Sequence, residues 1–446
     1  MVNPVYDVVI IGGGVAGTAL LYTLATFTDL KRIALIEKYP GLAAVNSKAT
    51  NNSQTIHCGD IETNYSLEKA LKVRRSAAML VRYAEQLPPS QRDRVIYKFS
   101  KMVLGVGPQE CEFLRQRYEV FRPHFTGMEL LEKAALAEVE PNVVKIDGRD
   151  RPEEVVAIAI AEEYTAINYG ELARSFVDQA QAVADKTIDL RLGQPVQAIK
   201  PQGENYQITT AEGSITARFV VVSAGGHSLL FAHRMGIGLN YSCLPVAGNF
   251  YFTPQRLNGK VYTVQNDKLP FAAIHGDPDV TIPGKTRFGP TALPLPLLER
   301  HNPRTIIDYL EVLKLDTTVA GVLWDLFKVR DIRNYIFKNM AFETPLINRR
   351  LFLQDARKIV PSLQLEELEF AHGIGGIRPQ LIDRENRQLI LGQAEIDPGN
   401  GLRFNITPSP GATTCLGNAE QDALRIQAHL GCEFDRSWFG TEAVPA

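Results

Sequence analysis

The chain begins with the pattern that most constrains its fold, an apolar run that leads directly into a glycine-rich turn. The run is Tyr6–Ile11 (YDVVII), the turn is Gly12–Gly17 (GGGVAG), and the apolar stretch Thr18–Thr26 follows. A short run rich in β-branched residues predicts a buried strand, and the stretch after the turn predicts a helix. Because the G-x-G-x-x-G spacing stands between a strand and a helix, it is typical of a dinucleotide-binding fold.

Three glycines of this turn have separate physical roles. Gly12 makes the tight turn, Gly14 lets backbone N–H groups approach a pyrophosphate at the helix N-terminus, and Gly17 allows close packing of helix on strand. A second predicted strand, Arg32–Ile36, ends in Glu37, twenty residues after Gly17. A carboxylate at this spacing is placed to accept a hydrogen bond from a ribose hydroxyl.

A later segment returns the chain to the same kind of fold. Ala217–Ala224 (ARFVVVSA) is another apolar, β-branched run, and it ends in Gly225 and Gly226. The alternating segments Leu190–Lys200 and Tyr206–Thr210 before it predict strands and a hairpin. The glycine-rich motif alone does not distinguish NAD from FAD. A nucleotide-binding domain that the chain re-enters near residue 220 nevertheless resembles the discontinuous domain of glutathione-reductase-like flavoproteins.

Composition narrows the class of protein further. The 446 residues include 48 basic and 50 acidic ones, for a net charge of -2, and 45% are apolar. These values disfavour a disordered chain, collagen and a polybasic protein that binds nucleic acid. The five cysteines are scattered without a C-x-x-C pair, which fits a reducing compartment. No apolar stretch reaches the roughly 20 residues needed to span a bilayer, so we expect a cytoplasmic protein or one peripheral to the inner face of the cell membrane.

The segment Lys48–Tyr65 (KATNNSQTIHCGDIETNY) is polar and loop-like, with a single histidine, His57. On general grounds a lone histidine is more often a hydrogen-bonded structural residue than a catalyst. The pattern Asn52–Gly59, however, resembles the flavin-contacting loop of the D-amino-acid-oxidase-type superfamily. Within that superfamily it is similar to malate:quinone oxidoreductases, particularly their short bacterial branch, and to L-2-hydroxyglutarate dehydrogenases. Segments at 260–279, 285–294, 371–383 and 406–419 extend the resemblance over nearly the whole chain.

The resemblance implies an FAD-dependent dehydrogenase that oxidises L-malate to oxaloacetate and passes the electrons to a membrane quinone. L-2-hydroxyglutarate stays open as the substrate, because the shared motifs do not separate the two. Two further alternatives are an amine oxidase of the same superfamily that returns electrons to oxygen, and a nucleotide-binding sensor without turnover. Because the sequence contains no iron–sulfur or haem ligand pattern, we expect an external electron acceptor.

Oxidation of a 2-hydroxy dicarboxylate needs a flavin that accepts hydride, a base for the hydroxyl proton, and cations that hold carboxylates. Arg378 follows a glycine pair and precedes Pro379, and it can bind one carboxylate bidentately. The alternative for Arg378 is a salt bridge at a domain seam. His275, in the run Phe271–Pro278 (FAAIHGDP), is the preferred base, since an ordinary imidazole pKa of about 6.5 suits proton transfer near neutral pH. His57 is the competing base.

The remaining candidates have ordinary structural roles as alternatives. Arg287 and Lys101 can bind the second carboxylate, influence the flavin electronics or form common salt bridges. His372 is either a third active-site histidine or a packed or solvated ring. The segment Thr407–Thr414 leads into a predicted helix, Cys415–Leu430, whose N-terminus would stabilise negative charge on the flavin. The residues expected to bind FAD are Gly12, Gly14, Ala16, Gly17, Glu37, Lys38, Asn52, Ser53, Gln54, Val196, Ala224, Gly225, Gly411, Ala412 and Thr413.

We therefore expect a fold of the α/β and α+β classes with two interleaved domains. A discontinuous Rossmann-like FAD domain takes residues 1–100, 155–244 and 366–446, and a mixed-sheet substrate domain takes residues 101–154 and 245–365. The segment Val319–Met340, with Trp324 beside Lys328, is a candidate for peripheral membrane contact. An amphipathic helix packed on the core is the commoner explanation of such a pattern.

Overall fold

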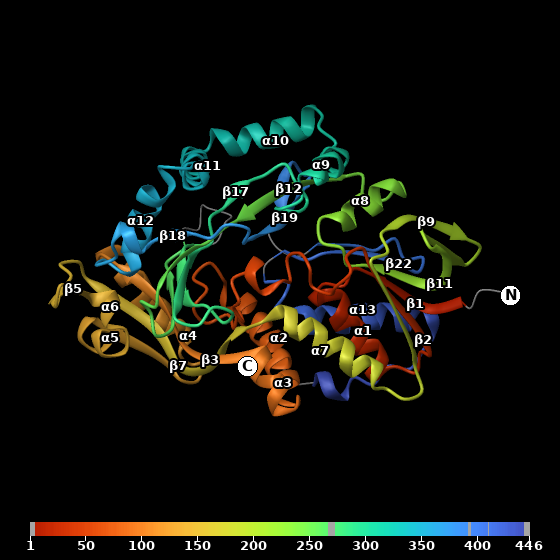
Figure 1. The fold of residues 1–446 in the computed structure, drawn as a ribbon, viewed down its shortest axis with the longest axis horizontal. Coiled ribbons are helices and arrows are strands. Elements are labelled where there is room, and N and C mark those ends of the chain that lie inside the picture. The colour runs from red at the N-terminus through yellow and green to blue at the C-terminus, as the bar shows by residue number, and fades with distance from the viewer. Residues whose placement is uncertain (1–4, 266–272, 391–393, 409, 441–446) are drawn as a thin grey trace.

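The structure is a computed structural model that describes residues 5–265, 273–390, 394–408 and 410–440. Residues 266–272 of the segment 260–279, and Ser409 of the segment 406–419, therefore lie outside the described residues. Figure 1 shows one sheet towards the N-terminus of the chain and a second sheet at the opposite side of the molecule.

The first sheet is built on the strands that the sequence predicts. Its order is β21-β22-β11-β1-β2-β8, with the hairpin of β9 and β10 attached to β11. The strands β8, β2, β1, β11 and β22 are parallel to one another, and only β21 runs antiparallel on the main path. Their bounds are β1 Val5–Ile11, β2 Arg32–Glu37, β8 Thr187–Leu192, β9 Val196–Gln202, β10 Asn205–Thr210, β11 Gly213–Val222, β21 Ala394–Ile396 and β22 Leu402–Ile406.

Alternating side chains of β1 bury the two faces of this sheet. Val8 and Ile10 pack towards the helices α1 (Val15–Phe27), α7 (Tyr169–Gln181) and α13 (Cys415–Leu430). Val9 and Ile11 belong to the core on the opposite face, which includes the β9–β10 hairpin and α8 (His227–Arg234). Because the strand is buried on both faces, it reads as a continuous apolar run, as the sequence indicates.

The second sheet has the order β18-β13-β16-β15-β14-β3-β7-β4 and is mixed, since β14 is parallel to β3 while the other pairs are antiparallel. A smaller sheet, β17-β12-β19-β20, lies between the two. The bounds are β3 Ile96–Val106, β4 Met128–Glu132, β7 Val155–Ile167, β12 Tyr241–Gly248, β13 Tyr251–Pro254, β14 Lys260–Thr263, β15 His275–Pro278, β16 Lys285–Gly289, β17 Leu293–Pro294, β18 Glu369–Phe370, β19 Gly376–Asp383 and β20 Gln388–Ile390. The predicted fold class, a Rossmann-like sheet with a mixed-sheet partner, is confirmed.

The predicted domain bounds stay a prediction. One strand bears on them: β7 begins at Val155, where the sequence starts a segment of the FAD domain, yet it pairs with β3 and β4 in the second sheet. β7 then leads into α7, which packs under the first sheet, so this strand connects the two sheets.

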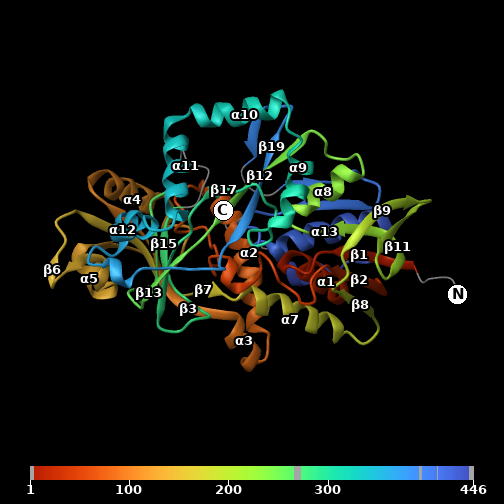
Figure 2. The same cartoon turned by 45° about the horizontal axis from the view of Figure 1, so that its top comes forward.

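The other helices lie mostly around the second sheet and along one edge of the molecule (Figures 1 and 2). They are α2 Leu67–Glu85, α3 Pro89–Val95, α4 Pro108–Phe121, α5 Lys133–Val139, α6 Pro141–Val144, α9 Ile306–Leu313, α10 Thr317–Lys328, α11 Arg330–Glu343 and α12 Asn348–Ile359. The segment Val319–Met340 is helical but falls on two helices, because Val329 is extended and separates α10 from α11. Among the described helices, none is both long and apolar enough to cross a membrane.

Candidate active site

A cavity of about 410 Å³ runs along the carboxyl ends of the parallel strands of the first sheet. This is the edge at which α/β sheets bind ligands. Fifteen of the predicted site residues line it, from segments that are far apart in the sequence. They are Gly12, Gly14, Ala16, Glu37, Lys38, Asn52, Ser53, His57, Val196, Ala224, Gly225, Arg378, Gly411, Ala412 and Thr413.

The glycine-rich turn has the tight geometry that its spacing predicts. Gly12 has a φ of 119°, and a Cβ atom there would lie 2.4 Å from the carbonyl oxygen of Ser223 on the neighbouring segment. A Cβ atom on Gly17 would lie 2.0 Å from the carbonyl oxygen of Gly12. Gly17 therefore does not line the cavity but lets α1 begin directly behind the turn.

Two helices begin at the cavity without a capping side chain. Gly14 is the N-cap of α1 and Thr414 is the N-cap of α13, and neither helix has an acidic residue in its first turn. The N–H of Val15 donates to Oγ of Ser47 and the N–H of Cys415 donates to the carbonyl of Ala412, so the positive end of each helix dipole and the other N–H groups of its first turn are available to an anion. These residues fit a bound dinucleotide, with a phosphate at α1 and the flavin ring near Gly411–Thr413 at α13.

The acid at the end of β2 is held by backbone groups. Glu37 accepts hydrogen bonds from the N–H groups of Gly13 (2.7 Å) and Tyr39 (2.9 Å), and its side chain lines the cavity. The next residue, Lys38, forms an ion pair with Glu299, which also accepts a hydrogen bond from the Tyr39 hydroxyl at 2.5 Å. Lys38 is therefore neutralised by an acid that the sequence did not reveal.

His57 is fixed by a carboxylate five residues further along its own loop. Its Nδ1 lies 2.8 Å from Oε1 of Glu62, while Oε2 of Glu62 accepts a hydrogen bond from the N–H of Gly59 at 2.9 Å. Burial alone would raise the pKa of Glu62, but His57, through its hydrogen bond and its charge, and Lys101 together outweigh burial and hold that pKa below its ordinary value. An ionised Glu62 accepts a hydrogen bond from the Nδ1–H group and so leaves Nε2 as the nitrogen of His57 that can take a proton.

The backbone of the same loop is tied to the α13 end of the cavity. The His57 N–H donates to Oγ1 of Thr413 at 3.1 Å, and the Tyr169 hydroxyl lies 2.9 Å from that oxygen and donates to the carbonyl of Thr55 at 2.7 Å. These bonds join the His57 loop, α7 and the segment before α13 into one wall of the cavity.

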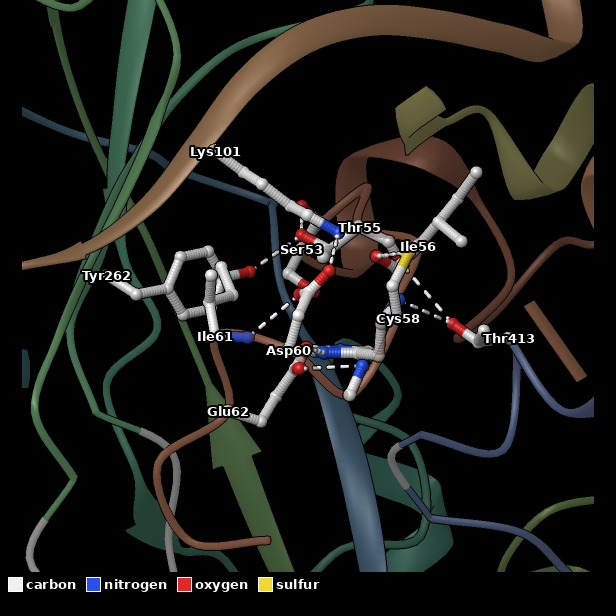
Figure 3. Close-up of polar contacts among 12 residues, drawn as sticks. Ser53, Thr55, Ile56, Cys58, Asp60, Ile61, Glu62, Lys101, Tyr262 and Thr413 are labelled. Atoms are coloured by element: carbon white, nitrogen blue, oxygen red, sulfur yellow. Dashed lines mark hydrogen bonds and ion pairs between the residues drawn. The ribbon is translucent and has the colours of Figure 1, made fainter. Parts of the chain in front are cut away.

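Lys101 lies behind this wall rather than in the cavity (Figure 3). Its ammonium group is buried, 2.6 Å from Asp60 and 2.6 Å from Glu163. Burial would lower the pKa of Lys101, but Asp60, Cys58 and Glu163 together outweigh burial and keep that pKa well above its ordinary value. The ammonium therefore pairs with two members of the cluster formed by Cys58, Asp60 and Glu163. These contacts argue against the predicted role of Lys101 in binding a substrate carboxylate.

His275 is also buried away from the cavity. It begins β15, as expected for a histidine at a strand end, but its ring stacks on Tyr262 with centroids 4.3 Å apart, and its Nδ1 lies 2.5 Å from Oδ2 of Asp277. Burial lowers the pKa of His275, although Asp277 opposes that shift. Only 2% of the residue is exposed, so its position argues against the role of base that the sequence favoured.

Three further predicted residues do not line the cavity. Arg287 is fully buried, forms an ion pair with Asp279 and donates to the carbonyl of Asn52 at 2.6 Å. Gln54 is buried beneath the same loop and accepts a hydrogen bond from the N–H of Val280 at 3.0 Å. Arg287 and Gln54 therefore support the loop that carries Asn52. His372 is exposed and contacts Phe370 edge-on, at 5.0 Å between ring centroids, which argues against a place in the active site.

Arg378, on β19, differs from the other buried cations because it faces the cavity and no acidic group pairs with it in the described part of the chain. Burial lowers the pKa of its guanidinium, whereas the hydroxyl groups of Tyr335, Tyr262 and Tyr65 act in the opposite direction. Sequence reasoning assigned no role to these tyrosines or to Glu62. The available signal for Glu62 and Tyr65 was their place in the segment Lys48–Tyr65, whose resemblance to the family was noted without a role for these two residues.

The comparisons with known proteins agree with this geometry. The sequence profile of the family described as "Malate:quinone oxidoreductase (Mqo)" matches residues 5–292. The chain is 47% identical to the probable malate:quinone oxidoreductase of Campylobacter jejuni over 98% of this chain and 99% of the relative. It is also 47% identical to the malate:quinone oxidoreductase of Helicobacter pylori, over 99% of this chain and 98% of the relative.

A solved structure shares the whole fold at lower sequence identity. The L-alpha-glycerophosphate oxidase from Mycoplasma pneumoniae, solved with FAD bound, matches with a TM-score of 0.66 and 21% identity over 99% of this chain and 100% of the other. The fold and the cavity define the class as a FAD-dependent oxidoreductase, and the predicted cofactor is confirmed. Within that class, the chain belongs to the malate:quinone oxidoreductase family, as its motifs indicated.

Proposed function

We propose that this protein oxidises L-malate to oxaloacetate and passes the two electrons to a quinone in the membrane. The observation that supports this best is the guanidinium of Arg378, which has no acidic partner among the described residues and lines the same cavity as the glycine-rich turn and His57. FAD, when bound there, supplies the group that accepts a hydride from the carbon bearing the hydroxyl. The chain's own residues bind the substrate and handle the proton.

Arg378 is suited to hold a substrate carboxylate. Its planar guanidinium can donate two parallel hydrogen bonds to one carboxylate, and burial strengthens such a pair. A buried cation without a partner is costly, so a site that contains one favours an anionic ligand. The tyrosines within electrostatic reach of Arg378 add neutral donors for the remaining oxygens.

We assign the proton of the substrate hydroxyl to Nε2 of His57. Its place in the cavity lining and its hydrogen bond to Glu62 support this role, because a carboxylate on Nδ1 stabilises the imidazolium that forms. His275, the base that the sequence favoured, has neither access to the cavity nor a free orientation, because it is stacked on Tyr262.

The fate of the electrons follows from the balance of the reaction. Oxidation of malate releases two electrons and two protons, and reduction of a quinone to a quinol consumes the same number. Since no described helix can cross a membrane, we propose that the protein meets the quinone by peripheral contact. The expected cytoplasmic location stays a prediction.

Anaerobic mixing of the FAD-loaded protein with a panel of substrates tests this proposal. L-malate should bleach the flavin absorbance, while L-2-hydroxyglutarate and an amino acid should do so far more slowly. Rapid bleaching by L-2-hydroxyglutarate and not by L-malate would overturn the substrate assignment. Bleaching by the amino acid alone would instead support an amine oxidase.

A further inference from the structure

A second cavity, of about 320 Å³, lies beside the cavity described above, which we now call the FAD cavity. The two cavities share a wall, since Ala44, Asn46 and Asn51 line both. Asn46 fixes this wall to β19, because its side chain donates to the carbonyl of Ile377 at 2.9 Å and accepts a hydrogen bond from the N–H of Ile377 at 3.0 Å. Of the two cavities, Arg378 lines only the FAD cavity, so the second cavity is separate from the proposed substrate site.

Three residues with basic side chains line the second cavity, namely Lys48, Arg300 and His301. Burial lowers the pKa of His301, and the positive charges of Arg300 and Lys48 act in the same direction, so both cations lie within electrostatic reach of the ring. Lys48 is exposed, and no acidic residue pairs with it in the part of the chain that the structure describes. Basic groups from two distant segments of the chain therefore meet at this cavity.

Arg300 uses only one side of its guanidinium within the protein. Its Nη2 lies 2.9 Å from Oε2 of Glu343, while Oε1 of Glu343 accepts a hydrogen bond from the Thr291 hydroxyl at 2.9 Å. Nη1 of Arg300 has no hydrogen-bond partner among the described residues, although only 10% of the side chain is exposed. A buried charged donor without a partner is costly, so this nitrogen indicates a ligand that accepts hydrogen bonds.

The acidic groups beside these cations are already paired. Glu299 lines the second cavity, but it forms an ion pair with Lys38 and accepts a hydrogen bond from the Tyr39 hydroxyl at 2.5 Å. Glu343 is paired with the guanidinium described above. The charge of Lys48 is thus left without a counter-charge among the described residues, which favours a negatively charged ligand over a neutral one.

We infer that the second cavity binds a small oxyanion, either a phosphate or a carboxylate. The oxygens of such a group can accept the hydrogen bond that Nη1 of Arg300 does not make within the protein, and Lys48 supplies the balancing charge. Glu343 already holds one side of the guanidinium, so the other side keeps a fixed direction for the ligand. A cavity of about 320 Å³ has room for a phosphate ion or a small dicarboxylate. The inference does not depend on the substrate of the FAD cavity.

Equilibrium dialysis of the FAD-loaded full chain against radiolabelled inorganic phosphate, at constant ionic strength, tests the inference without turnover. The protein is loaded with FAD because an empty α1 N-terminus would itself attract phosphate. We expect saturable binding, which Lys48→Gln and Arg300→Gln should each weaken at least about tenfold, because each removes a charged donor.

The matched controls are Lys72→Gln and Arg115→Gln, which should bind phosphate like the wild type. Lys72 is an exposed lysine, and Arg115 is an arginine that pairs with Glu132 and Glu154. Neither residue lines the FAD cavity or the second cavity. The absence of saturable binding, or binding that survives both Lys48→Gln and Arg300→Gln, would overturn the inference.

Phosphate bound at the substrate arginine must be distinguished from phosphate in the second cavity. The same dialysis with Arg378→Lys should retain the binding that depends on Lys48 and Arg300, and complete loss of phosphate binding in Arg378→Lys would overturn the inference. In Arg378→Lys, displacement of the phosphate by succinate would show that a carboxylate shares the site, while no displacement would restrict the site to phosphate. Both results support an oxyanion site and differ only in the source of the ligand.

The absorbance ratio of flavin to protein shows whether each variant is folded. If Arg300→Gln loses FAD, the comparison of Lys48→Gln with Lys72→Gln decides the result, because both lysines are exposed. Equal phosphate binding by these two variants would then overturn the inference.

Discussion

The contact between Glu62 and His57 predicts the effect of Glu62→Gln, a substitution that removes the negative charge and keeps nearly the same shape. The two carboxylate oxygens of Glu62 accept from separate donors, Nδ1 of His57 at 2.8 Å and the N–H of Gly59 at 2.9 Å. In Glu62→Gln only one acceptor oxygen remains. If that oxygen stays on Gly59, the amide group donates to Nδ1 and the proton of the ring moves to Nε2, which can no longer act as the base.

The magnitude follows from the kind of hydrogen bond that is lost. A hydrogen bond to a charged group contributes about 1.5–3 kcal/mol, and in this case the loss falls on the imidazolium that forms as the proton leaves the substrate. Since about 1.4 kcal/mol corresponds to a factor of ten in rate, flavin reduction should slow roughly 10- to 150-fold. The affinity for malate should change little, because Glu62 faces His57 rather than the arginine that holds the carboxylate.

Anaerobic stopped-flow mixing separates these two effects. The limiting rate of flavin bleaching at saturating L-malate reports the chemical step, and its dependence on concentration reports the Kd of malate. Glu163→Gln is the matched control, since Glu163 shares Lys101 with Asp60 but has no contact with His57. A wild-type limiting rate in Glu62→Gln would refute the assigned role of His57 and Glu62. An equal slowing in both variants would show that the effect is structural.

The remaining predictions concern the substrate, the cofactor and stability. Arg378→Lys should weaken L-malate binding roughly 10- to 150-fold with FAD retained, because an ammonium cannot reproduce the two parallel hydrogen bonds of the guanidinium. A substrate titration of flavin absorbance measures the affinity, and an unchanged affinity would contradict the role of Arg378 in binding a carboxylate. Burial raises the pKa of Tyr65, so its hydroxyl stays protonated as a donor, and Tyr65→Phe should weaken binding of L-malate about tenfold but leave binding of L-2-hydroxybutyrate, which lacks the second carboxylate, nearly unchanged. Gly12→Ala should yield protein without FAD, because the added Cβ would meet the carbonyl of Ser223, whereas Gly41→Ala, with nothing within 4 Å, should retain the cofactor; the absorbance ratio of flavin to protein measures both. Burial alone would raise the pKa of Asp279, but Arg287 holds that pKa below its ordinary value. The stability that the ionised Asp279 contributes is therefore present above about pH 4 and is lost as the pH falls through the lowered pKa. Asp279→Asn should lower the free energy of unfolding by about 3–5 kcal/mol at pH 7 because a buried cation loses its partner, and the Tm of this variant should fall less than the Tm of the wild type on further acidification.

The parts of the predicted site that line the cavity together depend mostly on contiguous residues. The spacing of the turn Gly12–Gly17 already implies a positive φ at Gly12 and a close approach of Gly17 to Gly12, with a helix directly behind. Glu37 follows because it ends the neighbouring parallel strand, and parallel strands end at the same edge of the sheet. The same logic placed Ala224 and Gly225 at the end of β11.

The predictions that the contacts argue against concern residues whose partners are far away in the sequence. Lys101 and Arg287 are the kinds of cation that bind a carboxylate, but each already has an acid of the protein, Asp60 and Asp279, beside it. His275 and His57 both precede a turn, and only the fold shows that Tyr262 covers the ring of His275. A single sequence reports which side chains can carry a charge, whereas their neutralisation depends on tertiary packing.

Neutralisation also bears on how a dicarboxylate fits the cavity. Among the described residues that line it, Lys38 pairs with Glu299 and Arg234 pairs with Glu311, which leaves Arg378 as the basic side chain without an acid. L-malate carries two carboxylates, so one cation cannot pair with both. We therefore propose that the second carboxylate binds neutral donors, for which the hydroxyl groups of Tyr65, Tyr262 and Tyr335 are the candidates because all three act electrostatically on Arg378. Such a site would hold the substrate with one strong charged contact and several weaker ones.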